Sequence, residues 1–258
     1  MTIKTPLTFS KASRTLRKSI LDLTFPIHVQ CALCEDEISG ESYFCESCMA
    51  KTLVLSDQIC MKCGRPLELP REHYRAYGGN CSICQTHFSY IKYHRAFTLY
   101  EGRAKQLLLS IKYKGNLQYT PIIAEGMAHA LRQSPFDGAV DLIVPVPIHK
   151  RRRLFRGFNQ AEIYANAMNA HDPELPVVSL LKRIKPTKKL KNLDKESRNK
   201  MMENAIIIEK SMVHLVAGKS VLLVDDIFTT GATLNACARV LYENGANAIF
   251  AITFAMGK

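Results

Sequence analysis

The chain has 258 residues, of which 47% are hydrophobic and 22% are charged, a balance that excludes a disordered protein and predicts a globular one. Its net charge of +12 suggests a polyanionic partner, although a generally basic proteome would also explain it. No apolar run approaches the roughly eighteen residues that a membrane span needs. The basic N-terminus is not followed by the apolar core of a secretory signal, so we expect a cytoplasmic protein.

All but one of the nine cysteines lie in four Cys-x-x-Cys pairs. Each pair can supply half of a tetrahedral zinc site, and a closed site of four thiolates holds a structural metal rather than a catalytic one. We therefore predict two structural zinc ions rather than disulfides, which a reducing cytosol disfavours. Sequential and cross-braced pairings use the same ligands and both remain open. The predicted ligands are Cys31, Cys34, Cys45, Cys48, Cys60, Cys63, Cys81 and Cys84. The ninth cysteine, Cys237, is expected in the core.

Strand and helix patterns alternate along the rest of the chain. Strands are expected at 95–100, 141–147, 204–209, from 221 and at 248–255, with helices at 104–113, 120–133, up to 170 and after 233. This alternation predicts an α/β fold with a doubly wound, mostly parallel sheet. We expect two domains. Residues 1–90 would form a short N-terminal helix and a small four-cysteine zinc-ribbon module, and residues 91–258 the α/β domain.

The most informative stretch is Val221 to Thr233, which reads VLLVDDIFTTGAT. Four apolar residues predict a buried parallel strand, and a helical pattern follows the turn. Ligands of open α/β sheets bind at this junction, where helix N–H groups attract phosphate. Asp225 and Asp226 could accept hydrogen bonds from two vicinal hydroxyls, whereas Thr229, Thr230, Gly231, Ala232 and Thr233 could cradle a phosphate. Together they predict a ribose 5-phosphate site. The alternative is an acidic pair that only caps the helix, and no GxxxxGK[ST] loop is present.

This stretch resembles the phosphoribosyl pyrophosphate signature of type I phosphoribosyltransferases. In that family the two acids hold the ribose hydroxyls and the TTGAT turn holds the 5′-phosphate. The resemblance implies Mg²⁺ bound with phosphoribosyl pyrophosphate. Lys150, Arg151, Arg152 and Arg156 follow an apolar strand, and we interpret them as a pyrophosphate clamp, because guanidinium groups pair with phosphate oxygens. A solvated basic loop is the alternative.

Further motifs narrow the resemblance to the ComF family of competence proteins. They are CALC, CESC, CMKCGRPL, YEG, IKYKG, VPVP, RGFNQ and DDIFTTGAT. That family joins a double zinc ribbon to a phosphoribosyltransferase-type domain and is linked to natural transformation. The resemblance implies a cytoplasmic role in DNA uptake on single-stranded DNA, with recombination or DNA-uptake proteins as partners. Leu190 and Met201 stand where relatives tend to have Gln and Asn, whereas Arg198 matches.

This departure leaves three functions open. The chain could transfer a phosphoribosyl group to an unknown acceptor in nucleotide or sugar metabolism. It could instead sense phosphoribosyl pyrophosphate while acting on DNA, or be a DNA-binding adaptor that no longer uses the site. The catalytic residues and the acceptor stay unknown.

Basic clusters interleaved with aromatic residues predict how single-stranded DNA would bind, with cations on phosphates and rings on bases. The aromatic residues are Tyr113, Phe155 and Phe158. The segment 182–200 is rich in lysine and too long for an ordinary connection, so it would be a lid or an insertion. The candidate DNA-binding residues are Lys112, Lys114, Arg153, Lys188, Lys189, Lys191 and Arg198.

Overall fold

The computed structural model describes residues 30–38, 41–53, 56, 58–68, 70–170, 175–185 and 205–257. The chain divides into two compact units, residues 1–49 and residues 50–258. The helix expected before Pro26 lies outside the described residues, and the domain boundary near residue 90 stays a prediction. No helix in the described ranges is long and apolar enough to cross a membrane.

The first unit is built from a cysteine-containing turn and the start of helix α2 (Glu46–Ala50). The turn is closed by a hydrogen bond from the Cys31 N–H to the Asp36 carbonyl at 2.8 Å. In the described part of this unit only Cys31, Ala32 and Phe44 are buried. So small a core cannot stabilise a fold alone, and a bound metal is the usual substitute.

The second unit is organised on a four-stranded parallel sheet with the order β1-β6-β5-β2. The strands are β1 (Tyr93–Leu99), β2 (Leu142–Pro145), β5 (Ser220–Phe228) and β6 (Ala248–Met256). The run Val221–Val224 is completely buried, as expected of a strand that is covered on both faces. The predicted fold class is confirmed, and β1 lies at one edge of the sheet.

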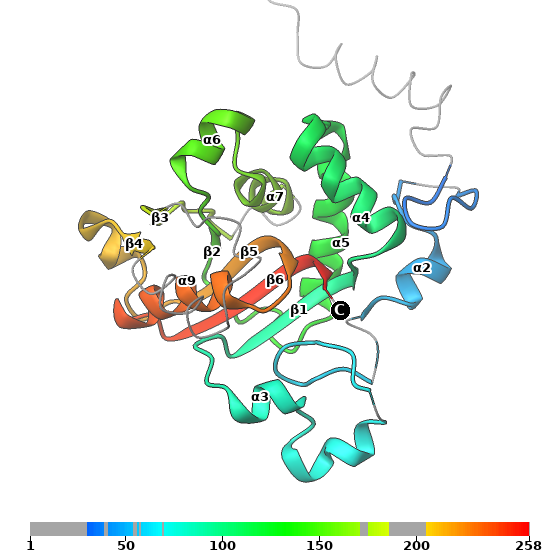
Figure 1. The fold of residues 1–258 in the computed structure, drawn as a ribbon, viewed down its shortest axis with the longest axis horizontal. Coiled ribbons are helices and arrows are strands. Elements are labelled where there is room, and N and C mark those ends of the chain that lie inside the picture. The colour runs from blue at the N-terminus through cyan, green and yellow to red at the C-terminus, as the bar shows by residue number, and fades with distance from the viewer. Residues whose placement is uncertain are drawn as a thin grey trace, which may run out of the picture. The chain divides into compact units, whose positions relative to one another are not determined.

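Different elements cover the two faces of this sheet (Figure 1). Helices α5 (Thr120–Arg132) and α7 (Gln160–Asn169) pack on one face. There, a Cβ at Gly126 would lie 2.8 Å from the Phe97 ring, so glycine permits the close approach of α5. Helix α9 (Ala232–Glu243) and the second cysteine loop (residues 60–84) share a core cluster with Val221 and Leu223. The second cysteine loop therefore covers part of this face of the sheet.

A separate two-stranded sheet pairs β3 (Leu181–Arg183) with β4 (Ile206–Ile208) in antiparallel fashion. The strand expected at 204–209 therefore exists, but it joins β3 instead of extending the parallel sheet. The Ile184 N–H donates to the Ala205 carbonyl at 2.8 Å, which brings the two flanks of segment 186–204 together. The segment itself lies outside the described residues.

Two local features differ from a plain helix or loop. The basic run after β2, for which a solvated loop was the alternative to a clamp, forms helix α6 (Lys150–Arg156), because the His149 ring caps it and Gly157 ends it at φ 82°. Helix α4 (Gly102–Leu109) continues into a π turn (Ser110–Lys114), which together confirm the helix expected at 104–113. Other short helices in the described residues are η2 (Arg71–Tyr77), α3 (Ser82–Thr86), η4 (Leu117–Tyr119) and η5 (Lys210–Leu215).

Candidate functional site

The turn between β5 and α9 forms a small hollow at the carboxyl end of the sheet. Its volume is about 50 Å³, and it is lined by Asp225 and by residues 227–234. Gly231 has φ 74°, and a Cβ there would lie 2.8 Å from the Phe228 ring, so only glycine suits this position. The Thr230 hydroxyl accepts from the Ala232 N–H at 3.4 Å. The residues proposed for the ribose and the 5′-phosphate therefore lie together at the start of α9.

The carboxyl group of Asp225 lies in an environment that disfavours its ionisation. Asp225 accepts a hydrogen bond from the backbone N–H of Asp226 at 2.9 Å. Burial, and then the neighbouring Asp226 carboxylate, raise the pKa of Asp225 well above its ordinary value. Hydroxyl donors or a divalent cation would offset both causes, which is the chemistry expected of a site for a diol or a metal-bound ligand.

Lys112 faces this acidic pair. Its Nζ lies 3.7 Å from Asp226 Oδ2, and the π turn that ends α4 carries it. We had assigned Lys112 to DNA, but its observed partner is an acid of the predicted ribose site. The Tyr164 side chain is also buried close by, where burial and then Asp226 and Asp225 raise its pKa. The sequence alone did not single out Tyr164.

Arg156 is the member of the predicted clamp that the structure brings toward the acids. It donates from Nη1 to Gln160 Oε1 at 2.9 Å and lies 5.9 Å from the centre of the Tyr113 ring. Burial and the neighbouring Arg152 lower the pKa of Arg156, and Asp226 opposes that shift. The other clamp residues, Lys150, Arg151 and Arg152, are exposed on α6.

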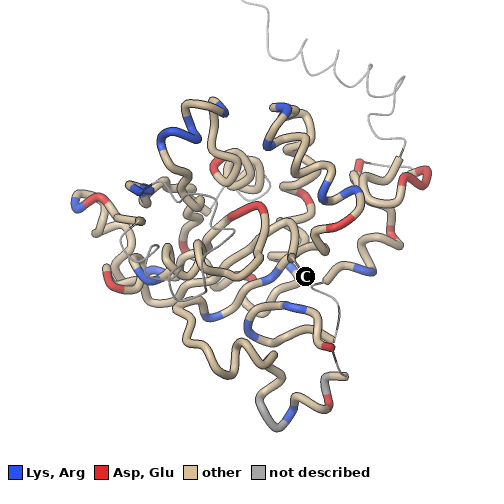
Figure 2. Tube along the Cα trace, viewed as in Figure 1, with Lys and Arg blue, Asp and Glu red and all other residues tan. Residues whose placement is uncertain are grey.

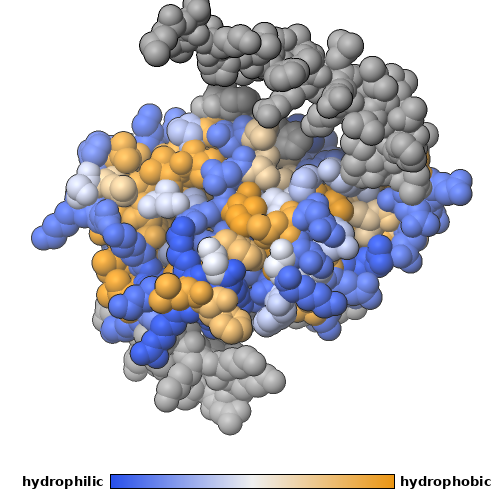
Figure 3. All heavy atoms as spheres, turned by 90° about the horizontal axis from the view of Figure 1, so that it is seen from above, coloured by the Kyte–Doolittle hydropathy of each residue, from blue (hydrophilic) through white to orange (hydrophobic). Residues whose placement is uncertain are grey.

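Helix α6 also carries exposed cationic and apolar side chains. Figure 2 shows the basic residues along it. Leu154 and Phe155, which lie among these basic residues, are 84% and 88% exposed. Figure 3 shows apolar residues interspersed with hydrophilic ones on the face that carries α6. Arg153 is paired with Glu162 at 2.9 Å, so it is less available to a phosphate than we expected. Lys114, in contrast, is exposed.

The remaining DNA-binding candidates, Lys188, Lys189, Lys191 and Arg198, lie outside the described residues, as do Leu190 and Met201. The flanks of their segment are nevertheless described. Arg183, at the end of β3, forms a parallel bridge with His149 at the start of α6. The base of the lysine-rich segment therefore lies beside α6.

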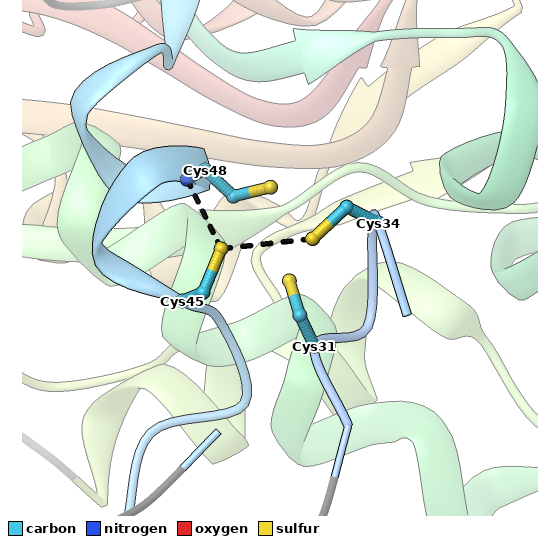
Figure 4. Close-up of side chains that lie close together, drawn as sticks. All are labelled: Cys31, Cys34, Cys45 and Cys48. Atoms are coloured by element: carbon cyan, nitrogen blue, oxygen red, sulfur yellow. Dashed lines mark hydrogen bonds between the residues drawn. The ribbon is translucent and has the colours of Figure 1, made fainter. Parts of the chain in front are cut away.

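The first four-cysteine cluster joins Cys31, Cys34, Cys45 and Cys48, whose thiols point toward one another (Figure 4). Their sulfur atoms all lie within 4.8 Å of one another, and Cys34 Sγ is 3.6 Å from Cys45 Sγ. A tetrahedron with Zn–S bonds of about 2.3 Å has edges of about 3.8 Å. The Cys48 N–H donates to Cys45 Sγ at 3.4 Å, as suits a thiolate. The cluster fits zinc.

The second cluster joins Cys60, Cys63, Cys81 and Cys84 within the same limit. Cys63 Sγ is 3.8 Å from Cys81 Sγ, and Cys60 Sγ accepts from the N–H groups of Cys63 and Cys81 at 3.5 and 3.3 Å. The pairing is therefore sequential, which resolves the choice that the sequence left open. The predicted structural zinc sites are supported by both clusters. Cys237 is buried in the core, as expected.

Buried hydrogen bonds tie the second cluster to the sheet. The His94 ring donates from Nδ1 to the Cys63 carbonyl at 2.8 Å, its Nε2 lies 3.0 Å from the Thr253 hydroxyl, and the ring stacks on Phe228 at 4.2 Å. Burial lowers the pKa of His94 to about 3, so this ring is neutral. The second cluster therefore packs against β5, the strand that leads into the phosphate turn.

Arg65 makes the most direct of these connections. Its Nη2 donates to the Thr229 carbonyl at 2.8 Å, and its Nη1 donates to the Gly257 carbonyl at 3.2 Å. One side chain of the second cysteine loop thus holds the first residue of the turn. We had not selected Arg65, although the CMKCGRPL motif contains it.

Comparison with known proteins gives two family matches. Residues 20–85 match a double zinc ribbon domain, and residues 117–258 match a phosphoribosyl transferase domain. Among solved structures, a purine phosphoribosyltransferase from Pyrococcus horikoshii is 16% identical, covering 52% of this chain and 79% of its own, with a TM-score of 0.31. That score is too low to support an inference.

Three curated relatives align with most of the chain. Competence protein ComFC of Bacillus subtilis is 26% identical, with 83% of this chain and 89% of the relative covered. Competence protein F of Haemophilus influenzae is 24% identical, and DNA utilization protein YhgH of Escherichia coli K12 is 25% identical; for each, 85% of this chain and 93% of the relative are covered. The resemblance to the ComF family is thus confirmed. Because the second family match spans more than half of the chain, this protein belongs to the phosphoribosyl transferase domain family, with a double zinc ribbon ahead of that domain.

Proposed function

We propose that the protein binds phosphoribosyl pyrophosphate with Mg²⁺ at the β5–α9 turn and binds single-stranded DNA, in a cytoplasmic role in DNA uptake during natural transformation. Relatives named as competence and DNA utilization proteins support the biological role. The observation that carries the binding proposal is the junction of Asp225 and Asp226 with the hollow of the turn.

Each part of this junction suits one part of the ligand. The two acids accept hydrogen bonds, which suits the ribose hydroxyls. The hollow offers threonine hydroxyls and the N–H groups of the first turn of α9, which suits the 5′-phosphate. Lys112 and Arg156, on the acidic side of the junction, supply positive charge for a pyrophosphate. Lys150, Arg151 and Arg152 on α6 would complete the clamp.

The acids also suit Mg²⁺. This ion prefers carboxylate oxygens together with the phosphate oxygens of its ligand. Burial, and then repulsion by the adjacent Asp226 carboxylate, raise the pKa of Asp225, and a bound cation would offset both causes. The ion would neutralise charge on the pyrophosphate, while this chain's residues hold the ribose end.

For DNA, we propose the surface that joins α6 to the base of segment 186–204. Exposed Lys114, the basic face of α6 and the exposed ring of Phe155 provide cations and a stacking surface. Lys188, Lys189, Lys191 and Arg198 extend the positive charge in the sequence. Recombination or DNA-uptake proteins would then receive the strand.

Calorimetry with phosphoribosyl pyrophosphate and Mg²⁺, with and without a single-stranded oligonucleotide, tests this proposal. The double variant Asp225→Asn with Asp226→Asn should lose ligand binding and stay folded, because neither acid supports the core. Glu243→Gln, at the exposed end of α9, is the matched control and should bind as the wild type does. Unchanged ligand affinity in the double variant would overturn the assignment.

A second candidate is transfer of the phosphoribosyl group to an acceptor of unknown identity. The position of Lys112 and Arg156 beside the acids favours it, because a departing pyrophosphate needs cations. Release of pyrophosphate during incubation with candidate bases would separate transfer from binding alone.

A further inference from the structure

A second and larger cavity lies beside the phosphate turn, in the seam between the second cysteine loop and α9. Its volume is about 320 Å³, against about 50 Å³ for the hollow of the turn. The cysteine loop, α3 and the segment leading to β1 line one side, and residues 228–232 with Asn235 line the other. We call it the seam pocket. Its size is in the range of small-ligand sites, which often lie where two structural layers meet.

The outer wall of the seam pocket is apolar and aromatic. Ile83 and Phe88 are 46% and 76% exposed, which is unusual for large apolar side chains that lie next to a cavity. The Phe88 ring makes an edge contact with Tyr90 at 4.8 Å, and Tyr90 contacts Tyr242 at 5.4 Å. The contact with Tyr90 is at the edge of a ring, so the exposed Phe88 side chain offers a surface on which a planar ring could stack.

Outside the four-thiolate cluster, the charged side chains that line the seam pocket are basic. Lys62 and Arg65 line it, and none of its lining residues is Asp or Glu. An anionic group therefore complements these two cations. Ser89 and Asn235, joined by a hydrogen bond of 3.1 Å, add polar groups at the α9 side.

We propose that the seam pocket binds a nucleotide, with the base against Ile83 and Phe88 and the phosphate near Lys62 and Arg65. The shared chemistry is a planar heteroaromatic ring next to a phosphate, and it has two sources: a free mononucleotide or the 5′-phosphorylated end of a single strand. Neither Asp225 nor Asp226 lines the pocket, so it lies apart from the acids of the ribose 5-phosphate site. The two sites share the wall formed by residues 228–232, so occupation of one should alter affinity at the other.

The test uses the full-length, zinc-loaded protein and calorimetry with deoxyadenosine monophosphate. Inorganic phosphate and deoxyadenosine alone should each bind at least about tenfold more weakly, because each reaches only one part of the pocket. Phe88→Ala and Lys62→Ala should each weaken binding roughly tenfold, the effect of losing one stacking or charge contact. Leu117→Ala and Lys219→Ala, both exposed and absent from the lining set, are the matched controls.

Two further arms decide the site and the source of the nucleotide. Asp225→Asn should abolish binding of phosphoribosyl pyrophosphate and leave the monophosphate bound, so failure of either proposal is visible separately. An oligonucleotide that binds through Phe88 and Lys62 only when 5′-phosphorylated identifies a strand end; binding of the monophosphate alone identifies a free nucleotide. The inference is overturned if the monophosphate does not bind, if Asp225→Asn removes it, or if both pocket variants bind it normally.

Discussion

Replacing Arg65 by methionine should weaken binding at the phosphate turn without direct removal of a ligand contact. Methionine keeps an apolar stem of similar length and deletes the guanidinium group. The deleted group makes two hydrogen bonds, to the carbonyls of Thr229 and Gly257. The Gly257 N–H in turn donates to the Phe228 carbonyl at 2.7 Å, so one substitution loosens both sides of the turn's entry.

The size of the effect follows from these contacts. A hydrogen bond to a charged group contributes about 1.5–3 kcal/mol, and partial exposure of these two reduces each to about 1 kcal/mol. A combined loss of about 2 kcal/mol corresponds to about 30-fold in affinity if all of it is needed to order the turn. We expect roughly 5- to 30-fold weaker binding of phosphoribosyl pyrophosphate.

The assay is calorimetry with Mg²⁺ present, alongside zinc content and thermal melting. Arg75→Met, an exposed arginine of η2 in the same cysteine-rich segment, is the control and should bind as the wild type does. Arg65→Lys should recover only part of the affinity, because an ammonium group cannot reproduce the two-pronged geometry. If Arg65→Met retains zinc and its melting temperature and binds with unchanged affinity, the second cysteine loop does not order the turn.

Three other outcomes are expected. Asp225→Asn should melt a few degrees higher than the wild type at pH 8, the shift that about 1 kcal/mol produces. Because the pKa of Asp225 is raised in the folded state, the carboxyl group favours folding at low pH, and this contribution is lost as the pH rises through the folded-state pKa. The advantage of asparagine should therefore shrink toward pH 4, and equal melting temperatures at pH 8 would contradict this reasoning. Metal analysis should find two zinc ions per chain, and Cys34→Ser and Cys81→Ser should each lose one of them. Only Cys81→Ser should lower the melting temperature of the sheet, because Cys81 belongs to the core cluster of the sheet. A single zinc ion in the wild type would refute the two-site arrangement. Replacing Lys188, Lys189 and Lys191 with alanine should lower the slope of log affinity for single-stranded DNA against log salt by up to about two units, at about 0.7 per phosphate contact, and leave zinc content unchanged; salt-independent binding would move the DNA site elsewhere.

Patterns that act over short distances were readable in the sequence. Val221–Val224 is uniformly apolar, which predicted a strand covered on both faces, and the turn at Gly231 carried its own glycine signal. The zinc ligands followed from the spacing of the cysteines. Their sequential pairing did not, because both pairings use the same residues and only proximity in space distinguishes them.

Features that depend on tertiary contacts could not be read. Helix α6 has no apolar periodicity, since Leu154 and Phe155 both face solvent, so the sequence predicted a basic segment there and no helix. The high helix propensity of Lys and Arg, together with Gly157 as a stop signal, would have predicted this helix. The partner of Lys112 was equally hidden. On the sequence it belongs to a basic cluster, and only the fold brings it to Asp226, more than a hundred positions later.

The π turn at Ser110–Lys114 gives Lys112 a dependence on chain length. A π turn closes its hydrogen bonds one residue later than an α turn, so it holds an extra residue within an otherwise regular helix. Deleting one residue of the turn would restore regular α-helical spacing and rotate the residues after it by about 100° around the axis. The ammonium group that now faces Asp226 would then point elsewhere, with every amino-acid type near the acids preserved. Chains of this family that differ here by a single deletion would keep the acidic signature and lose the cation beside it, so the length of α4 is as informative as its composition.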